Sequence, residues 1–216
     1  MSQIRNIIFD FDGTLVDTAP LIIATMQETI SLLGLPPKSA EECKATIGLR
    51  LGEIPEVLWP ERVGLGESFA DNYRRIFDRL KRSLAVKCFP GVIDGLRLLH
   101  QRGLGLAIAS SRSHKSLAEY VEQFDLGDCF GMLVGGDDVS NGKPAPDPVL
   151  SILDRLGWRA EETLTVGDAA VDILMGKGGG TMTCAVTYGN GTEQELTSAH
   201  PDYTVSCFAS LIEITG

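Results

Sequence analysis

Residues 6–17 are Asn6-Ile7-Ile8-Phe9-Asp10-Phe11-Asp12-Gly13-Thr14-Leu15-Val16-Asp17, a short apolar run that turns abruptly to carboxylates and a glycine. A run of this length bounded by a polar turn is typical of a strand that is buried on both faces of a parallel sheet. The stretch therefore predicts a buried first strand followed by a polar loop.

The same pattern returns three times further along the chain. The apolar runs 104–109, 132–134 and 164–166 end at Ser110-Ser111, Gly135-Gly136 and Gly167-Asp168. Helical stretches are expected between the runs at 92–101, 115–124, 147–156 with Gly157 as a stop, and 171–177, and residues 176–180 are expected to end a helix before the next strand. Strands that alternate with helices predict an α/β fold with a mostly parallel sheet, in which ligands bind beyond the carboxyl ends of the strands.

The alternation lapses between about residue 19 and residue 84, where only helices are predicted. Thr18 is expected to cap the first of them and Gly34 to end it, and Ser39 with Glu42 matches a capping box for a second. Apolar residues at helical spacing form a stripe expected to face the core of the insert: Phe69, Tyr73, Ile76, Phe77, Leu80 and Leu84. We expect a core made of residues 1–15 and 86–216, an all-helical insert at 16–85, and a hinge where the chain leaves and re-enters the core.

Charge and composition exclude several classes of partner. The chain has 216 residues, 44% of them hydrophobic, and 29 acidic against 19 basic residues give a formal charge of −10. That sign disfavours nucleic acid and anionic membrane surfaces as partners. The five cysteines are widely spaced without a C-x-x-C pair, so we expect reduced and mostly buried thiols. No signal peptide or membrane span is predicted, which favours a cytoplasmic location.

Carboxylates gather at the predicted strand ends. Asp10 and Asp12 lie two apart, so in extended backbone both side chains point to one face, and Asp168 ends another strand. Oxygen ligands of this kind suit Mg²⁺. Asp172 follows Asp168 by one helical turn.

The order of these residues resembles the haloacid dehalogenase superfamily of phosphohydrolases over essentially the whole chain. Residues 10–17 are similar to the first motif, Ser110 to the second-motif Ser or Thr, Lys143 in Gly-Lys-Pro-Ala-Pro-Asp to the third-motif lysine, and residues 167–172 to the fourth-motif acidic pair. The resemblance implies a Rossmann-like parallel sheet with an inserted helical cap, as in the phosphoglycolate phosphatase and beta-phosphoglucomutase groups.

The resemblance also implies a mechanism. Asp10 would attack phosphorus to form an aspartyl-phosphate, and Asp12 would act as general acid and then as general base. Mg²⁺ would be held by the Asp10 carboxylate, the Asp12 backbone carbonyl and Asp168, while Asp172 would position Lys143 or a metal-bound water. The residues implied to bind the substrate are Gly13, Thr14, Arg50, Ser110, Ser111 and Lys143.

The second acid of the first motif argues for phosphoryl transfer, because the dehalogenases of the superfamily lack it. A helical cap suits a small phosphorylated metabolite, and Arg50 lies in a stretch, 47–51, that resembles the cap loop reaching toward the active site. Ser110-Ser111-Arg112 departs from the Thr-Asn-Lys common in phosphoglycolate phosphatases, and Ala169 replaces a common Ser.

Several alternatives to a phosphoglycolate phosphatase-like activity stay open. A mutase of the beta-phosphoglucomutase type is disfavoured, because its cap histidine has no counterpart: His100, His114 and His200 lie outside the insert. Nucleotidase and pyrophosphatase activities stay open, because the motifs fix the reaction type and leave the substrate undetermined. A phospho-Asp receiver, the rival from another class, differs in size and in the strand that carries the phosphoacceptor. The oligomeric state is not encoded in any pattern that we recognise.

Overall fold

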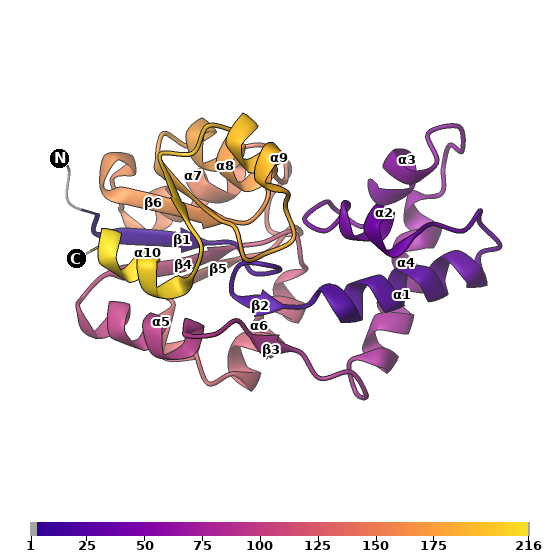
Figure 1. Cartoon of the computed structure of the whole chain (residues 1–216), viewed down its shortest axis with the longest axis horizontal. Coiled ribbons are helices and arrows are strands. Elements are labelled where there is room, and N and C mark those ends of the chain that lie inside the picture. Colours follow the sequence, from indigo (N-terminus) through magenta and orange to yellow (C-terminus); the bar gives the residue numbers. More distant parts are fainter. Residues whose placement is uncertain (1–3, 216) are drawn as a thin grey trace. The chain divides into compact units, whose positions relative to one another are not determined.

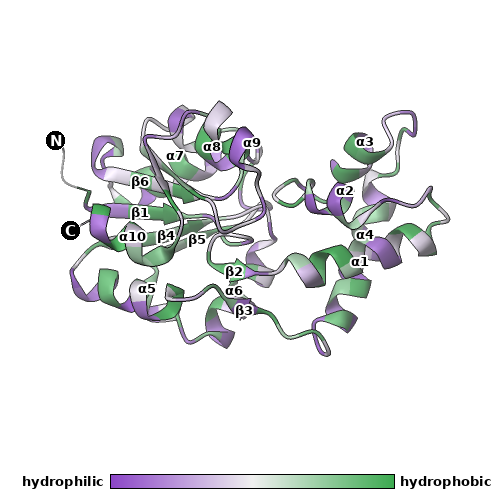
Figure 2. Cartoon of the chain, in the orientation of Figure 1, coloured by the Kyte–Doolittle hydropathy of each residue, from purple (hydrophilic) through white to green (hydrophobic). Residues whose placement is uncertain are grey.

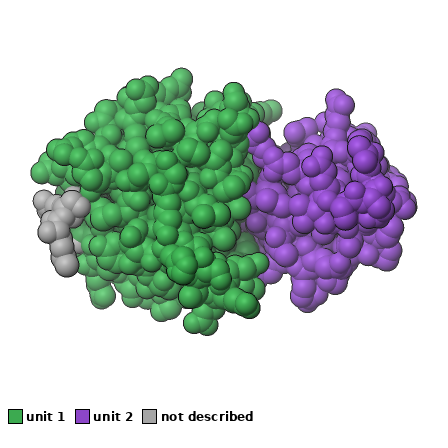
Figure 3. Space-filling model, turned by 90° about the horizontal axis from the view of Figure 1, so that it is seen from above, with its two compact units in different colours: residues 1–16, 88–216 green, residues 17–87 purple. Residues whose placement is uncertain are grey.

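A computed structural model describes residues 4–215 of the chain. Figure 1 shows its helices and strands, and Figure 3 colours its two compact units. Unit 1 comprises residues 1–16 and 88–216, and unit 2 comprises residues 17–87.

Unit 1 is built on a six-stranded sheet whose strand order is β5-β4-β1-β6-β7-β8, with every neighbouring pair parallel. This is the α/β fold with a Rossmann-like parallel sheet that the sequence predicts. The strands are β1 (Asn6–Phe9), β4 (Gly105–Ala109), β5 (Met132–Val134), β6 (Thr163–Gly167), β7 (Met182–Val186) and β8 (Tyr203–Val205).

Most side chains of the central strands are apolar, and the strands are buried on both faces of the sheet. All four residues of β1 are buried, and the neighbouring β4 and β6 are buried over nearly their whole lengths. The sheet strands are correspondingly coloured largely as hydrophobic in Figure 2. Ala107 and Ala109 of β4 are small enough for helix α7 (Asp147–Leu156) to pack closely, through Val149 and Ile152. Burial on both faces fixes the position of β1, and with it the loop that follows.

Helices cover both faces of this sheet. In Figure 1, α7, α8 (Ala170–Gly178) and α9 (Glu193–Ser198) lie on one face, and α5 (Val92–Gln101), α6 (His114–Gln123) and α10 (Phe208–Ile214) lie on the other. Two short 3₁₀ helices, η1 (Gly127–Cys129) and η2 (Ala160–Glu162), precede β5 and β6. Gly157 ends α7 with a left-handed φ of 65°, which confirms the predicted stop.

Unit 2 consists of helices α1 (Ala19–Leu32), α2 (Ala40–Lys44), α3 (Ile54–Leu58) and α4 (Gly66–Leu80). Its core is a chain of aromatic contacts in which Phe69 lies 6.4 Å from the rings of both Trp59 and Tyr73, and Tyr73 stacks on Phe77. The predicted capping box is present, since the Glu42 backbone N–H donates to Ser39 Oγ and the Ser39 backbone N–H donates to Glu42.

Two details of the predicted insert are wrong. Thr18 occupies the position before α1, but with φ −99° and ψ −7° its side chain accepts no capping hydrogen bond. Leu84 lies beyond the end of α4 and is 40% exposed, so it does not belong to the buried stripe. Gly34 follows the end of α1 with φ +60°, as predicted.

The two linker segments pair with each other. Strand β2 (Val16–Asp17) and strand β3 (Lys87–Cys88) form a separate two-stranded sheet. The Phe89 backbone N–H donates to the Leu15 carbonyl at 3.0 Å, which continues this pairing by one more residue on each segment. The two linkers are therefore joined to each other through their backbones.

The sequence predicts reduced and mostly buried cysteines, and the structure has three of the five buried. All five cysteines are free, with Cys43, Cys129 and Cys184 buried, Cys88 half-buried and Cys207 exposed. Among the helices of residues 4–215, none combines the length and apolar character that a membrane crossing requires.

Candidate active site

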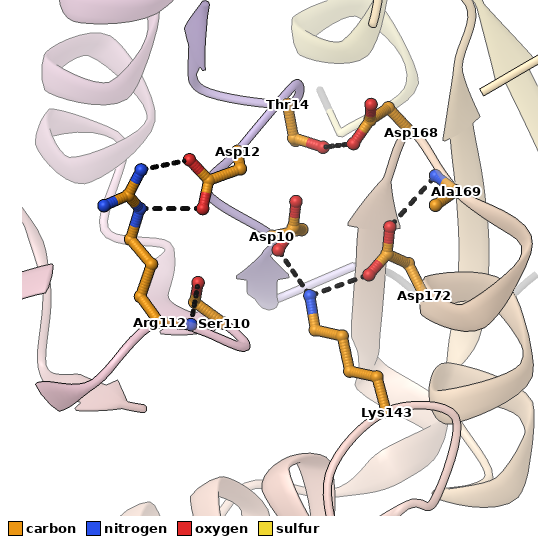
Figure 4. A network of polar contacts seen from close by, with 9 residues as sticks. All are labelled: Asp10, Asp12, Thr14, Ser110, Arg112, Lys143, Asp168, Ala169 and Asp172. Carbon is orange, nitrogen blue, oxygen red and sulfur yellow. Dashed lines mark hydrogen bonds and ion pairs between the residues drawn. The ribbon is translucent and has the colours of Figure 1, made fainter. Parts of the chain in front are cut away.

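Three neighbouring strands deliver polar side chains to one edge of the sheet. Asp10, Ser110 and Asp168 each follow directly after the last residue of β1, β4 and β6. These strands are adjacent in the sheet, so parallel pairing brings their carboxyl ends together. All three residues are buried, and Figure 4 shows the polar contacts around them.

Lys143 lies between two buried carboxylates. It belongs to the loop that precedes α7, and its Nζ donates to Asp10 Oδ1 and, at 2.7 Å, to Asp172 Oδ1. Asp172 is itself fixed, because its second oxygen accepts the backbone N–H of Ala169 at 3.0 Å at the start of α8. The lysine therefore joins the end of β1 to the first turn of α8, and it orients the Asp10 carboxylate.

Asp168 is held by the loop after β1 and by the loop after β7. Its Oδ1 accepts the Thr14 hydroxyl at 3.1 Å, and its Oδ2 accepts the Asn190 backbone N–H at 2.6 Å. Gly13 lies directly against it with φ +88°, where an added Cβ would come within 2.1 Å of Asp168 Oδ2. Only glycine fits both this conformation and this close approach.

Burial and neighbouring charges shift the pKa values of the ionisable groups in the site. Burial raises the pKa of Asp10 well above its usual range, and the charges of Asp172 and Asp168 add to this, while Lys143 opposes it. Burial and the charge of Asp172 raise the pKa of Asp168 to about 7. Burial alone would lower the pKa of Lys143, but Asp10 and Asp172 outweigh it and raise that pKa.

The donor set fits a divalent cation. Asp10, Asp168 and Asp172 each offer a carboxylate oxygen within 4.8 Å of the others. Counted as ionised, these three carboxylates have a formal charge of −3, which Lys143 offsets by one. An excess of two negative charges, presented by oxygen atoms alone, matches a hard ion such as Mg²⁺.

Asp12 faces away from this cluster, toward an arginine. Its Oδ2 accepts Arg112 Nε and its Oδ1 accepts Arg112 Nη2, both at 2.7 Å, in a two-pronged ion pair. Sequence reasoning noticed Arg112 only as a departure from a family pattern. Its position two residues after Ser110 was the available signal, and the pairing with Asp12 was missed.

The remaining predicted site residues have different surroundings. Ser110 Oγ accepts the Arg112 backbone N–H at 3.2 Å, and Ser111 is half-buried beside it. Thr14 uses its hydroxyl on Asp168. Arg50 is half-buried in unit 2, between α2 and α3. The 190–192 segment, for which the sequence predicts no role, supplies the backbone N–H of Asn190 that donates to Asp168.

A parallel six-stranded sheet covered by helices, with Asp10 and Asp168 directly after adjacent strands and Lys143 in a loop beside them, defines a Rossmann-like α/β protein with a buried polar site. The family model for haloacid dehalogenase-like hydrolases matches residues 7–186. The chain therefore belongs to the haloacid dehalogenase-like hydrolase family.

Individual relatives agree with this assignment. The chain is 31% identical over 237 residues to a phosphoglycolate phosphatase of Salmonella paratyphi A, with 100% of this chain and 94% of the relative covered. It is 32% identical over 214 residues to pyrophosphatase PpaX of Halalkalibacterium halodurans, with 99% and 98% covered. The crystal structure of a haloacid dehalogenase-like hydrolase from Bacteroides fragilis matches with a TM-score of 0.91 at 28% identity, with 97% of this chain and 100% of that chain covered. The chain is accordingly an enzyme, a phosphatase of the haloacid dehalogenase type.

Proposed function

We propose that the enzyme hydrolyses a small phosphate monoester, with Mg²⁺, through a phosphoryl group carried on Asp10. The observation that supports this most strongly is the contact of the buried Asp10 carboxylate with Lys143, at the end of the central strand. Lys143 leaves the second oxygen of Asp10 for attack and neutralises charge that would otherwise repel an anionic substrate.

In the first half of the reaction, an Asp10 oxygen forms a bond to phosphorus while the bond from phosphorus to the leaving oxygen breaks. Asp12 gives its proton to that oxygen, so the product leaves as an alcohol. In the second half, water attacks phosphorus, the bond to Asp10 breaks, and Asp12 takes the proton of the water. Inorganic phosphate is released and both carboxyl groups return to their starting states.

Asp10, Asp168 and the backbone carbonyl of Asp12 would hold the metal ion, with Asp172 positioning Lys143 beside them. The bound ion supplies positive charge where the phosphate and the Asp10 carboxylate would otherwise repel each other. Ser110, Ser111, Gly13 and Thr14 are proposed to surround the phosphoryl oxygens, through hydroxyl groups and backbone N–H groups.

Phosphoglycolate is the proposed leading substrate, because curated relatives that span the whole chain are named for it. Unit 2 would serve as the helical cap that selects the substrate, and Arg50 would bind a second anionic group such as a carboxylate. Inorganic pyrophosphate is the second candidate, since the Halalkalibacterium relative that spans the chain is named a pyrophosphatase.

Phosphate release from a panel of esters and pyrophosphate, with and without Mg²⁺, tests this proposal. The wild type is expected to release phosphate only with the metal, and both Asp10→Asn and Asp12→Asn to lose that activity. Asp125→Asn, at a carboxylate that is 95% exposed, is the matched control and should retain full activity. Metal-independent turnover, or an Asp10→Asn variant as active as the wild type, would refute the proposed mechanism.

A further inference from the structure

The ion pair between Arg112 and Asp12 is two-pronged and largely shielded from solvent. Two nitrogens of one guanidinium meet the two oxygens of one carboxylate, both at 2.7 Å, and the side chains are only 10% and 11% exposed. A fork of this geometry fixes the plane and direction of a carboxylate, which a lysine cannot do. Figure 4 shows the fork beside Asp10.

The guanidinium is held from several sides. It lies 5.6 Å from the ring centre of Phe11 and 5.0 Å from that of Tyr120, and its third nitrogen, Nη1, donates to Ser116 Oγ at 3.1 Å. The backbone N–H of Arg112 donates to Ser110 Oγ. Such a packed cation is a fixed support and is poorly suited to move out and bind a substrate.

We propose that Arg112 is a positioning residue that sets the orientation of Asp12 for proton transfer. This inference rests on the proposed function, in which Asp12 exchanges protons with the leaving oxygen and with water. The fork takes one acceptor direction on each oxygen of Asp12, out of about four that a carboxylate has, and so fixes the plane of the group. Arg112 itself touches neither phosphorus nor the leaving oxygen.

The proposal predicts an effect that depends on the leaving group. An alkyl phosphate needs a proton on its departing oxygen, whereas 4-nitrophenolate departs without one. The value of kcat/KM covers the steps up to formation of the phosphoenzyme, so it reports on the proton given to the leaving oxygen. A misplaced Asp12 therefore lowers kcat/KM for the alkyl ester and spares it for the aryl ester.

The test measures kcat/KM for phosphoglycolate and for 4-nitrophenyl phosphate in wild type, Arg112→Gln, Arg112→Lys and Asp12→Asn. Where phosphoglycolate is not a substrate, the best alkyl ester of the panel replaces it. Arg112→Gln is expected to lose about 100-fold on the alkyl ester and less than about 5-fold on the aryl ester. Arg112→Lys should recover little, because it restores charge without the fork. In the Asp12→Asn background, adding Arg112→Gln should cause less than about 2-fold further loss.

Two additional variants separate positioning from folding. Arg97→Gln breaks an exposed pair with Asp125 and should leave both esters unaffected. Ser116→Ala removes one support of the guanidinium and should show the same ester selectivity in milder form, even if Arg112→Gln proves unstable. The inference would be overturned if Arg112→Gln and Ser116→Ala each lowered kcat/KM equally for both esters. It would also be overturned if the loss from Arg112→Gln multiplied with the loss from Asp12→Asn in the double variant. Absent wild-type turnover, or turnover that survives Asp10→Asn, would instead refute the proposed function.

Discussion

Replacing Lys143 by Met should cost both stability and activity, because Lys143 is the cation shared by two buried carboxylates. Its Nζ contacts Asp10 and lies 2.7 Å from Asp172, and the lysine side chain is 2% exposed. Methionine fills similar volume without charge, so the variant leaves both acids uncompensated. Breaking a buried pair by removing one partner costs about 3–5 kcal/mol. For a chain of this size, that corresponds to a thermal midpoint lowered by roughly 6–20 °C.

Calorimetry in EDTA and phosphate release with Mg²⁺ measure the two effects. Activity should fall by about 10²–10³-fold, the usual loss when one charge-stabilising donor is removed. Adding Asp10→Asn to the Lys143→Met variant should raise the thermal midpoint part of the way back to the wild-type value. The reason is that the double variant has one buried carboxylate without a cation instead of two. Lys115→Met, at an exposed lysine of α6, is the control and should change neither quantity. A midpoint within about 1 °C of wild type would refute the view that Lys143 neutralises this cluster.

Two further predictions concern the close contact of Gly13 with Asp168 and the reactivity of the Cys207 thiol. Gly13→Ala should lower kcat/KM by at least about 100-fold and weaken Mg²⁺ binding in a titration, because the added Cβ would meet Asp168 Oδ2 at 2.1 Å. Near-wild-type values would contradict that contact. Cys207 is exposed, and hydrogen bonds from Ser210 lower its pKa, so one thiol should react fast with 5,5′-dithiobis(2-nitrobenzoate) at pH 7. The fast phase should vanish in Cys207→Ser, and its persistence would show that another cysteine reacts.

Local pattern was sufficient to predict most of the elements that carry the site. The run 132–134 and the helices 92–101 and 147–156 have the predicted bounds, because each combines clear periodicity with a turn or a glycine at its end. Strand β8 was not predicted, since three residues of which two are exposed leave no apolar run. Strand β7 was expected only as the next strand after 176–180, without bounds, because its Thr183 and Cys184 interrupt the apolar pattern.

The site could be predicted in part for a similar reason. Asp10, Ser110 and Asp168 follow apolar runs, so a parallel sheet brings them together whatever the details. The pairing of Arg112 with Asp12 joins residues 100 positions apart and depends on how their two loops pack. No periodicity or local motif encodes such a contact, and only the three-dimensional structure places the guanidinium.

The most direct test of the account is to search for a phosphoryl group on Asp10. The Asp12→Asn variant is mixed with Mg²⁺ and 4-nitrophenyl phosphate, whose leaving group departs without a proton from Asp12, then quenched in acid, and its peptides are analysed by mass spectrometry. Because the second half of the reaction needs the base at position 12, the peptide containing Asp10 should gain one phosphoryl group, and Asp10→Asn should gain none. Phosphate release by the wild type with no adduct in the Asp12→Asn variant, or with the adduct on another residue, would contradict the central claim.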